Sequence, residues 1–80
     1  MKIPRDLDYQ EIIKILTPFG YSVTRQTGSH IRLTTEQNGE HHITIPAHRP
    51  VKIGTLNSII VSIAGHFGYT KSELMDRLFG

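Results

Sequence analysis

Hydrophobic residues recur at helical spacing in two stretches of the chain, one near each end. In the first stretch the apolar side chains stand three or four positions apart: Tyr9, Ile12, Ile13, Leu16 and Phe19. That spacing places them on one face of a helix, which must pack against another element. Asp8 and Glu11 form a capping-box pattern at its start. Pro18 and Gly20 end the predicted helix.

The second helical pattern lies in the last third of the chain. Its apolar stripe consists of Leu56, Ile59, Ile60, Ile63 and Phe67. Thr55 stands in the position of an N-cap, so we expect this helix to begin there. A second capping box, formed by Thr70 and Glu73, predicts a short closing helix from Lys71 to Phe79.

Between the helical patterns, apolar and polar residues alternate, as in β-strands that pack on one side. Three such stretches occur, at residues 21–26, 30–35 and 41–45. They are joined by short connections, which favours an antiparallel meander. We therefore predict an α+β fold of order α-β-β-β-α, with a three-stranded antiparallel sheet, helices packed on one face and a short extra C-terminal helix.

The length of the turn between the second and third strands can be inferred from the strand pairing that each length produces, because cross-strand partners share a face. A three-residue loop at 37–39 pairs Leu33 with Ile43 and keeps the apolar side chains together. A two-residue loop at 38–39 would pair Leu33 with Thr44 and mix the two faces. We predict the three-residue loop.

The turn between the first and second strands carries the motif Gly-Ser-His. A three-residue turn at 27–29 would pair Val23 with Leu33 and Gln26 with His30. His30 would then be the first residue of the second strand, where its ring faces an open surface. Imidazole, with a pKa near ~6.5 in model peptides, can take and give a proton at cellular pH. His30 is therefore a candidate general acid or base, although such a histidine can also be a solvated residue beside a turn.

The predicted open face of the sheet is rich in hydrogen-bonding groups and has no carboxylate. Its members are Ser22, Thr24, Gln26, His30, Arg32, Thr34, His42 and Thr44. A solvated sheet face ordinarily mixes in Glu and Asp, so this composition fits an anionic ligand. A plain polar surface fits it equally well.

The composition indicates one small domain spanning residues 1–80. Nine Lys and Arg residues against seven Asp and Glu give a net charge of +2, which is too weak to identify a nucleic-acid-binding protein. The chain has no cysteine, so thiolate metal sites are excluded and a reducing compartment is expected. No apolar run reaches the ~18 residues of a membrane span, and the first residues lack a signal-peptide pattern. We expect a soluble, cytoplasmic protein.

The connection after the third strand, residues 46–54, is basic and contains no acid. It holds His48, Arg49 and Lys52 and runs into the predicted helix start at Gly54 and Thr55. Free amides, the helix dipole and the cations all favour negative charge there, which makes it a candidate phosphate site. An ordinary strand-to-helix crossover has the same appearance.

Three motifs in a fixed order carry a family likeness: Gly28-Ser29-His30, then the run from Ile43 to His48, then the run from Lys52 to Ile60. Together they resemble the HicA family of toxins of type II toxin–antitoxin systems, over nearly the whole chain. The resemblance implies a double-stranded-RNA-binding-domain-like fold, an activity that cleaves mRNA, and a HicB antitoxin that holds the enzyme inactive. The family's catalytic histidine corresponds to His30. A second histidine often follows it in the family, whereas this chain has Ile31.

RNA carries its own nucleophile, so a metal-free cleavage needs a base for the 2′-hydroxyl, cations for the phosphorane and an acid for the leaving oxygen. We assign His30 as the base, without cofactor or metal, and His48 ahead of His42 as the acid. The remaining RNA- or phosphate-binding candidates are Gly28, Ser29, Arg32, Arg49, Lys52, Gly54 and Thr55. An acidic or aromatic antitoxin surface laid over this site would exclude RNA by competition.

Two other functions fit parts of the sequence. One is a non-catalytic module that holds double-stranded RNA by shape and phosphate contacts, although such binders tend to be more basic. The other is a metallo-hydrolase that uses His41, His42 and His48. Adjacent strand residues point to opposite faces and no carboxylate stands at a useful spacing, which argues against the metal site.

Overall fold

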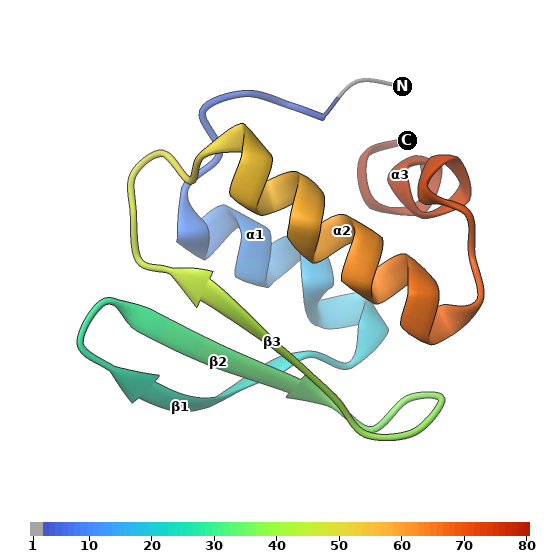
Figure 1. The fold of residues 1–80 in the computed structure, drawn as a ribbon, viewed down its shortest axis with the longest axis horizontal. Helices are drawn as coiled ribbons and strands as arrows, with labels where there is room; N and C mark the ends of the chain where they lie inside the picture. The colour runs from blue at the N-terminus through green and yellow to red at the C-terminus, as the bar shows by residue number, and fades with distance from the viewer. Residues whose placement is uncertain (1–2) are drawn as a thin grey trace.

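The computed structural model describes residues 3–80 and confirms the predicted α+β class and element order. The elements are α1 (Tyr9–Leu16), the 3₁₀ turn η1 (Thr17–Phe19), β1 (Ser22–Thr27), β2 (His30–Thr35), β3 (His41–Pro46), α2 (Ile53–Phe67) and α3 (Lys71–Phe79). The strands form one antiparallel sheet in the order β1-β2-β3. Figure 1 shows α1 and α2 on the same side of the sheet, with α3 beyond the C-terminal end of α2. Within the described residues, no helix is long and apolar enough to cross a membrane.

The core lies between the sheet and the helices. It is built from the stripes predicted for the two main helices, the apolar positions of β2 and β3, and residues that flank them. The buried apolar residues are Ile12, Leu16, Tyr21, Ile31, Leu33, Ile43, Ile45, Val51, Leu56, Ile59, Ile60, Ile63, Ala64, Leu74 and Met75. The helix side of β2 and β3 is therefore used for packing, whereas all of β1 is exposed and the other face of the sheet is open.

The end of α1 shows why Gly20 is required. After η1 the chain turns with Gly20 in the left-handed region, at φ 83°. A Cβ atom at this position would stand 2.6 Å from Oγ1 of Thr35, closer than two such atoms approach. Thr35 is buried and its hydroxyl donates to the carbonyl of Phe19 at 2.6 Å. The turn is therefore held against the end of β2, and only glycine fits both the dihedral angle and the space.

The pairing of β2 with β3 has the predicted register. Leu33 pairs with Ile43, and Ile31 with Ile45. Gly39 adopts a positive φ of 96° in the connecting loop. All four paired side chains are buried, so the rule that apolar partners share a face was sufficient to choose this register.

The pairing of β1 with β2 differs from the prediction at the turn. Val23 pairs with Leu33 as expected, but the pairing of Gln26 with His30 is wrong, because Thr27 is the residue opposite His30. The turn thus has two central residues, with φ 57° at Gly28, as favoured in tight hairpins. A β-bulge between Val23 and residue 25 accommodates one additional residue in β1, so that Val23 still pairs with Leu33.

The second helix begins two residues before the predicted cap. Its N-cap is Lys52, with extended backbone, and the amide of Leu56 donates to the Lys52 carbonyl at 3.0 Å. Thr55 lies inside the first turn. The preceding residue, Val51, is buried and its amide donates to the Leu7 carbonyl at 2.9 Å, so the helix starts as soon as the chain leaves this anchor.

The capping predictions at the other helix starts are confirmed. At α3 the amide of Glu73 donates to the Thr70 hydroxyl at 3.1 Å, and the Thr70 amide donates to the Glu73 carboxylate at 2.8 Å. At α1 the amide of Asp8 donates to Oε1 of Glu11 at 3.1 Å. The short closing helix has the predicted bounds, Lys71–Phe79.

Candidate functional site

The open face of the sheet carries the predicted polar side chains, with one exchange. Because of the bulge, Arg25 pairs with Arg32 and therefore shares its face, whereas Gln26 pairs with Ile31 on the helix side. Placing Gln26 on the open face was thus wrong, and Arg25 takes its place. The prediction did not include Arg25 because it assumed unbroken alternation. The signal that could have found it is the Gly-Ser pair, which is typical of a two-residue turn.

His30 lies at the exposed start of β2, opposite Thr27 on one side and Pro46 on the other. Among the described residues, no side chain or backbone group forms a hydrogen bond with its ring. Both ring nitrogens are therefore available to a bound molecule. The tight turn before His30 fixes its backbone without using its side chain.

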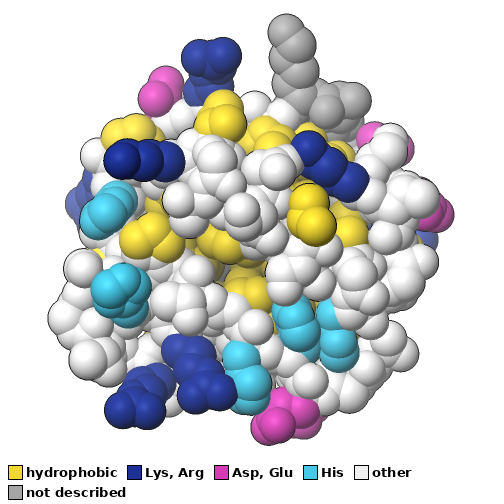
Figure 2. Space-filling model, in the orientation of Figure 1, with side chains coloured by type: hydrophobic (Ala, Val, Ile, Leu, Met, Phe, Trp, Pro, Cys, Tyr) yellow, Lys and Arg dark blue, Asp and Glu magenta, His cyan; other side chains and the backbone are white. Residues whose placement is uncertain are grey.

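The connection after β3 begins at the end of the sheet where His30 lies, because Pro46 pairs with His30, and His48 is the second residue of this connection. The amide of Ala47 donates to the carbonyl of Ser29 at 2.7 Å, and the amide of His48 donates to Pro46 at 2.8 Å. The start of this connection is thus tied to the turn that carries His30. Figure 2 shows histidine side chains at the left of the molecule, with Lys and Arg side chains above and below them.

Arg25 and Arg32 stand directly opposite each other on neighbouring strands. Like charges in such positions repel, and no carboxylate in residues 3–80 forms an ion pair with either guanidinium. Arg32 is two residues from His30 on the same face of β2, at ~7 Å along the strand. The pair is an electrostatic cost to the free protein that a bound polyanion would relieve, and it lies where a phosphate beside His30 would be.

The basic connection is only partly free for a ligand. The guanidinium of Arg49 donates to Oε1 of Gln10 at 3.1 Å and lies 5.3 Å from the centre of the Tyr9 ring. It is held against α1, so a phosphate contact would require Arg49 to leave these partners. Lys52 is exposed at the start of α2, next to the exposed Gly54, and Thr55 is half-buried.

The opposite end of the open face holds a chain of hydrogen bonds. The hydroxyls of Thr24 and Thr34 lie 2.8 Å apart, and the Thr34 hydroxyl lies 2.7 Å from Nδ1 of His42. Nε2 of His42 is 3.6 Å from a carboxylate oxygen of Glu40. His42 pairs with Thr34, four residues along β2 from His30, which corresponds to ~13 Å. The structure thus separates His42 from His30.

His41 belongs to a structural cluster at the end of the sheet. Its Nδ1 lies 2.7 Å from the hydroxyl of buried Tyr21, and its Nε2 lies 3.2 Å from the Ser62 hydroxyl. The His41 and His66 rings stack, with centroids 4.5 Å apart. Burial, then the charges of His66 and His42, lower the pKa of His41, and burial raises the pKa of Tyr21 to about 12. In residues 3–80 no three His, Cys, Asp or Glu side chains gather as metal ligands.

The structure thus combines a small α+β domain, helices on one face of the sheet, and an exposed histidine beside paired arginines on the other face. A family model described as "HicA toxin of bacterial toxin-antitoxin" matches residues 9–65. The chain therefore belongs to the HicA toxin family, as its motifs predicted, and membership implies an antitoxin partner. Searches among curated proteins and among solved structures gave no match.

Proposed function

We propose that this toxin is a metal-independent endoribonuclease that cleaves mRNA, with His30 as the general base. The observation that carries the proposal is the juxtaposition on one exposed face of an unpartnered His30 and the unneutralised pair Arg25 and Arg32. A base must reach the proton that it removes, and a developing phosphorane needs cations beside it. Family membership supports the same chemistry.

The proposed reaction uses the RNA's own 2′-hydroxyl as nucleophile. His30 takes the hydroxyl proton, the 2′-oxygen bonds to the adjacent phosphorus, and the bond from phosphorus to the 5′-oxygen breaks. The leaving oxygen receives a proton from an acid. The products are a 2′,3′-cyclic phosphate and a 5′-hydroxyl, and Arg25 and Arg32 stabilise the additional charge on the phosphorane.

His48 is the better candidate for the acid. It is exposed, and the hydrogen bond between Ala47 and Ser29 ties its connection to the turn before His30. His42 lies ~13 Å along the strand, and its Nδ1 is within hydrogen-bond distance of Thr34. The acid and base of one displacement must reach the same phosphate, which favours His48 over His42.

The same face also suggests how the toxin is silenced. We propose that a HicB-like antitoxin covers His30 and the arginine pair with carboxylates or aromatic side chains and excludes RNA by competition. Cations that attract phosphate also attract an acidic protein surface, and close charge pairs of this kind contribute to binding rate and specificity.

The test is cleavage of RNA by the purified protein in excess EDTA, followed by analysis of the product ends. We expect cleavage to proceed and the 3′ ends to carry a cyclic phosphate or its hydrolysis product. Loss of activity that magnesium or zinc restores would contradict the metal-independent mechanism. Tight RNA binding with no cleavage under any condition would instead favour the non-catalytic RNA-binding module.

A further inference from the structure

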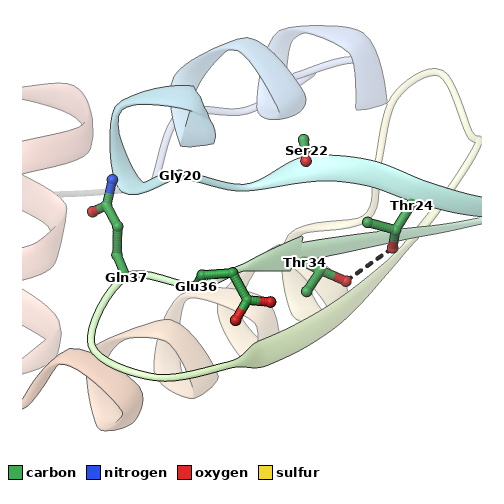
Figure 3. A pocket seen from close by; sticks show the side chains of 6 residues that line it. All are labelled: Gly20, Ser22, Thr24, Thr34, Glu36 and Gln37. Atoms are coloured by element: carbon green, nitrogen blue, oxygen red, sulfur yellow. Dashed lines mark hydrogen bonds between the residues drawn. The ribbon is translucent and has the colours of Figure 1, made fainter.

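The open face ends in a hollow that the proposed chemistry does not use. It has a volume of about 520 Å³ and lies at the end of β2 opposite His30. Its lining residues are Gly20, Ser22, Thr24, Thr34, Glu36 and Gln37. Figure 3 shows the Thr24 and Thr34 hydroxyls turned toward each other, with the Glu36 carboxylate extending from the chain just beyond β2. The volume is within the range of small-ligand sites, ~300–1,000 Å³.

The hollow is continuous with the proposed RNA-binding face. Thr34 and Arg32 are on the same face of β2, and Thr24 and Arg25 both lie opposite Arg32 at the bulge. A single RNA strand held at its phosphates by the two arginines would therefore cross the hollow on one side of the cleavage point. Single-stranded RNA is recognised by unstacked bases that turn into protein sites and bond through their edges.

Glu36 supplies the charged side chain in the lining of this hollow. Its carboxylate is exposed, and within residues 3–80 it forms no ion pair. An ionised carboxylate accepts hydrogen bonds only, through two oxygens side by side. The hydroxyls of Thr24 and Thr34 are held by each other and by His42, and Nε2 of Gln37 donates to the Pro18 carbonyl. The Ser22 hydroxyl, Oε1 of Gln37 and the Glu36 carboxylate remain, and of these the carboxylate is the strongest acceptor because it is charged.

The Watson–Crick edge of guanine presents two adjacent donors, N1–H and N2–H, which match the two carboxylate oxygens. Adenine and cytosine each place a ring-nitrogen acceptor beside their amino group, and that acceptor would face the second oxygen. Uracil has a single donor between two carbonyl oxygens. Guanine is therefore the base whose edge a carboxylate accepts without an opposed lone pair.

We infer that the hollow is a guanine-binding subsite, in which Glu36 accepts hydrogen bonds from N1–H and N2–H of a base a few nucleotides from the cleaved phosphate. The inference rests on the proposed function, because the strand must first lie across the His30 face. A protein side chain with paired donors would satisfy the carboxylate equally well. The adjoining arginine pair would bind phosphates, and this favours RNA over a protein side chain as the ligand.

The test measures binding rather than cleavage, so that it does not depend on the proposed catalysis. Labelled eight-residue oligouridylates that contain one guanine, adenine or cytosine are titrated with the His30→Ala protein and followed by fluorescence anisotropy. We expect the guanine oligomer to bind about tenfold more tightly than the others, as for a good bidentate base contact. Glu36→Gln should abolish that preference.

Glu40→Gln is the matched control, because it removes the same charge from the same loop at a residue outside the lining of the hollow, and a glutamine oxygen can still accept from His42. It should retain the guanine preference, although both variants bind every RNA somewhat more tightly. Equal affinities for all oligomers, or a preference that survives Glu36→Gln, would overturn the inference. Unchanged base affinities with weakened antitoxin binding would assign the hollow to a protein side chain instead. A guanine preference without any cleavage by the unmutated protein would contradict only the proposed catalysis.

Discussion

Two histidines at opposite ends of the sheet show how position decides the role of one side-chain type. His30 is exposed, and its ring has no hydrogen-bond partner among the described residues. The His41 ring contacts the Tyr21 and Ser62 hydroxyls and stacks on His66. A histidine whose nitrogens are both engaged stabilises the fold, whereas one with free nitrogens on a rigid turn can act on a substrate.

The difference follows from strand parity. His30 is on the open face and His41, opposite buried Thr35, is on the helix side, where α2 supplies Ser62 and His66. Removing the His30 imidazole should therefore lower activity, whereas removing the His41 imidazole should lower stability. The predictions below test that division.

The largest effect is expected for His30→Ala. Loss of a general base lowers the rate by ~10²–10⁴-fold, and the side chain supports no core residue, so folding should be unchanged. The measurements are RNA cleavage rate, growth arrest on induction, and circular dichroism with thermal melting. A folded alanine variant that still cleaves RNA and arrests growth would contradict the assignment of His30 as the general base.

Reversing charge beside His30 should reduce activity by a smaller factor. Arg32→Glu and Arg25→Glu each replace a phosphate-binding cation by a repelling anion, and Lys52→Glu does the same at the start of α2. We expect cleavage to fall by about tenfold or more and antitoxin affinity to fall with it. Lys14→Glu, on α1, is the control and should spare both.

These variants are measured by cleavage rate and by titration with the antitoxin at several salt concentrations. If cleavage falls while antitoxin affinity and its salt dependence are unchanged, the inhibitor binds elsewhere on the toxin. Inhibition would then act at a distance from His30 instead of by covering it.

His41→Ala should destabilise the fold and leave the chemistry of the folded fraction intact. The substitution leaves the hydroxyl of buried Tyr21 without its partner, which costs about 1–3 kcal/mol in the free energy of unfolding. Urea denaturation measures this loss, with His48→Ala as an exposed control. Adding Tyr21→Phe to His41→Ala should recover part of the stability, and a double variant that loses the full sum would contradict the assigned contact.

The smallest expected effect is a pH dependence of stability at the His41 end. Burial and the charges of His66 and His42 lower the pKa of His41 in the folded protein. The unfolded chain therefore binds a proton at His41 at a higher pH than the folded protein does. The contribution of neutral His41 to the free energy of unfolding is thus present above ~pH 6.5 and is lost as pH falls through the folded pKa. We expect the melting temperature to fall on acidification, and to fall less for His41→Gln than for the unmutated protein or for His48→Gln. Equal acid sensitivity in all three would contradict the role of His41.

Hydrophobic periodicity determined most of the fold. It located the helices and the three strands, and the rule that apolar partners share a face produced the register of Leu33 with Ile43. Capping residues predicted the bounds of α3, and the motif order around His30 predicted the family. These features follow from interactions between residues that are near in sequence or alternate regularly, so they can be predicted from the sequence alone.

Other features were decided by the tertiary structure. The bulge in β1 places Arg25 opposite Arg32, and the buried Val51 starts α2 before its apparent cap. The hydrogen bond from Ala47 to Ser29 ties the His48 connection to the His30 turn, and packing of α2 stacks His66 on His41. Periodicity predicts which face a residue takes only while the period is unbroken. Where turns, bulges and distant segments compete, the packing of the whole chain sets the lowest free energy, and residues far apart in the sequence then meet.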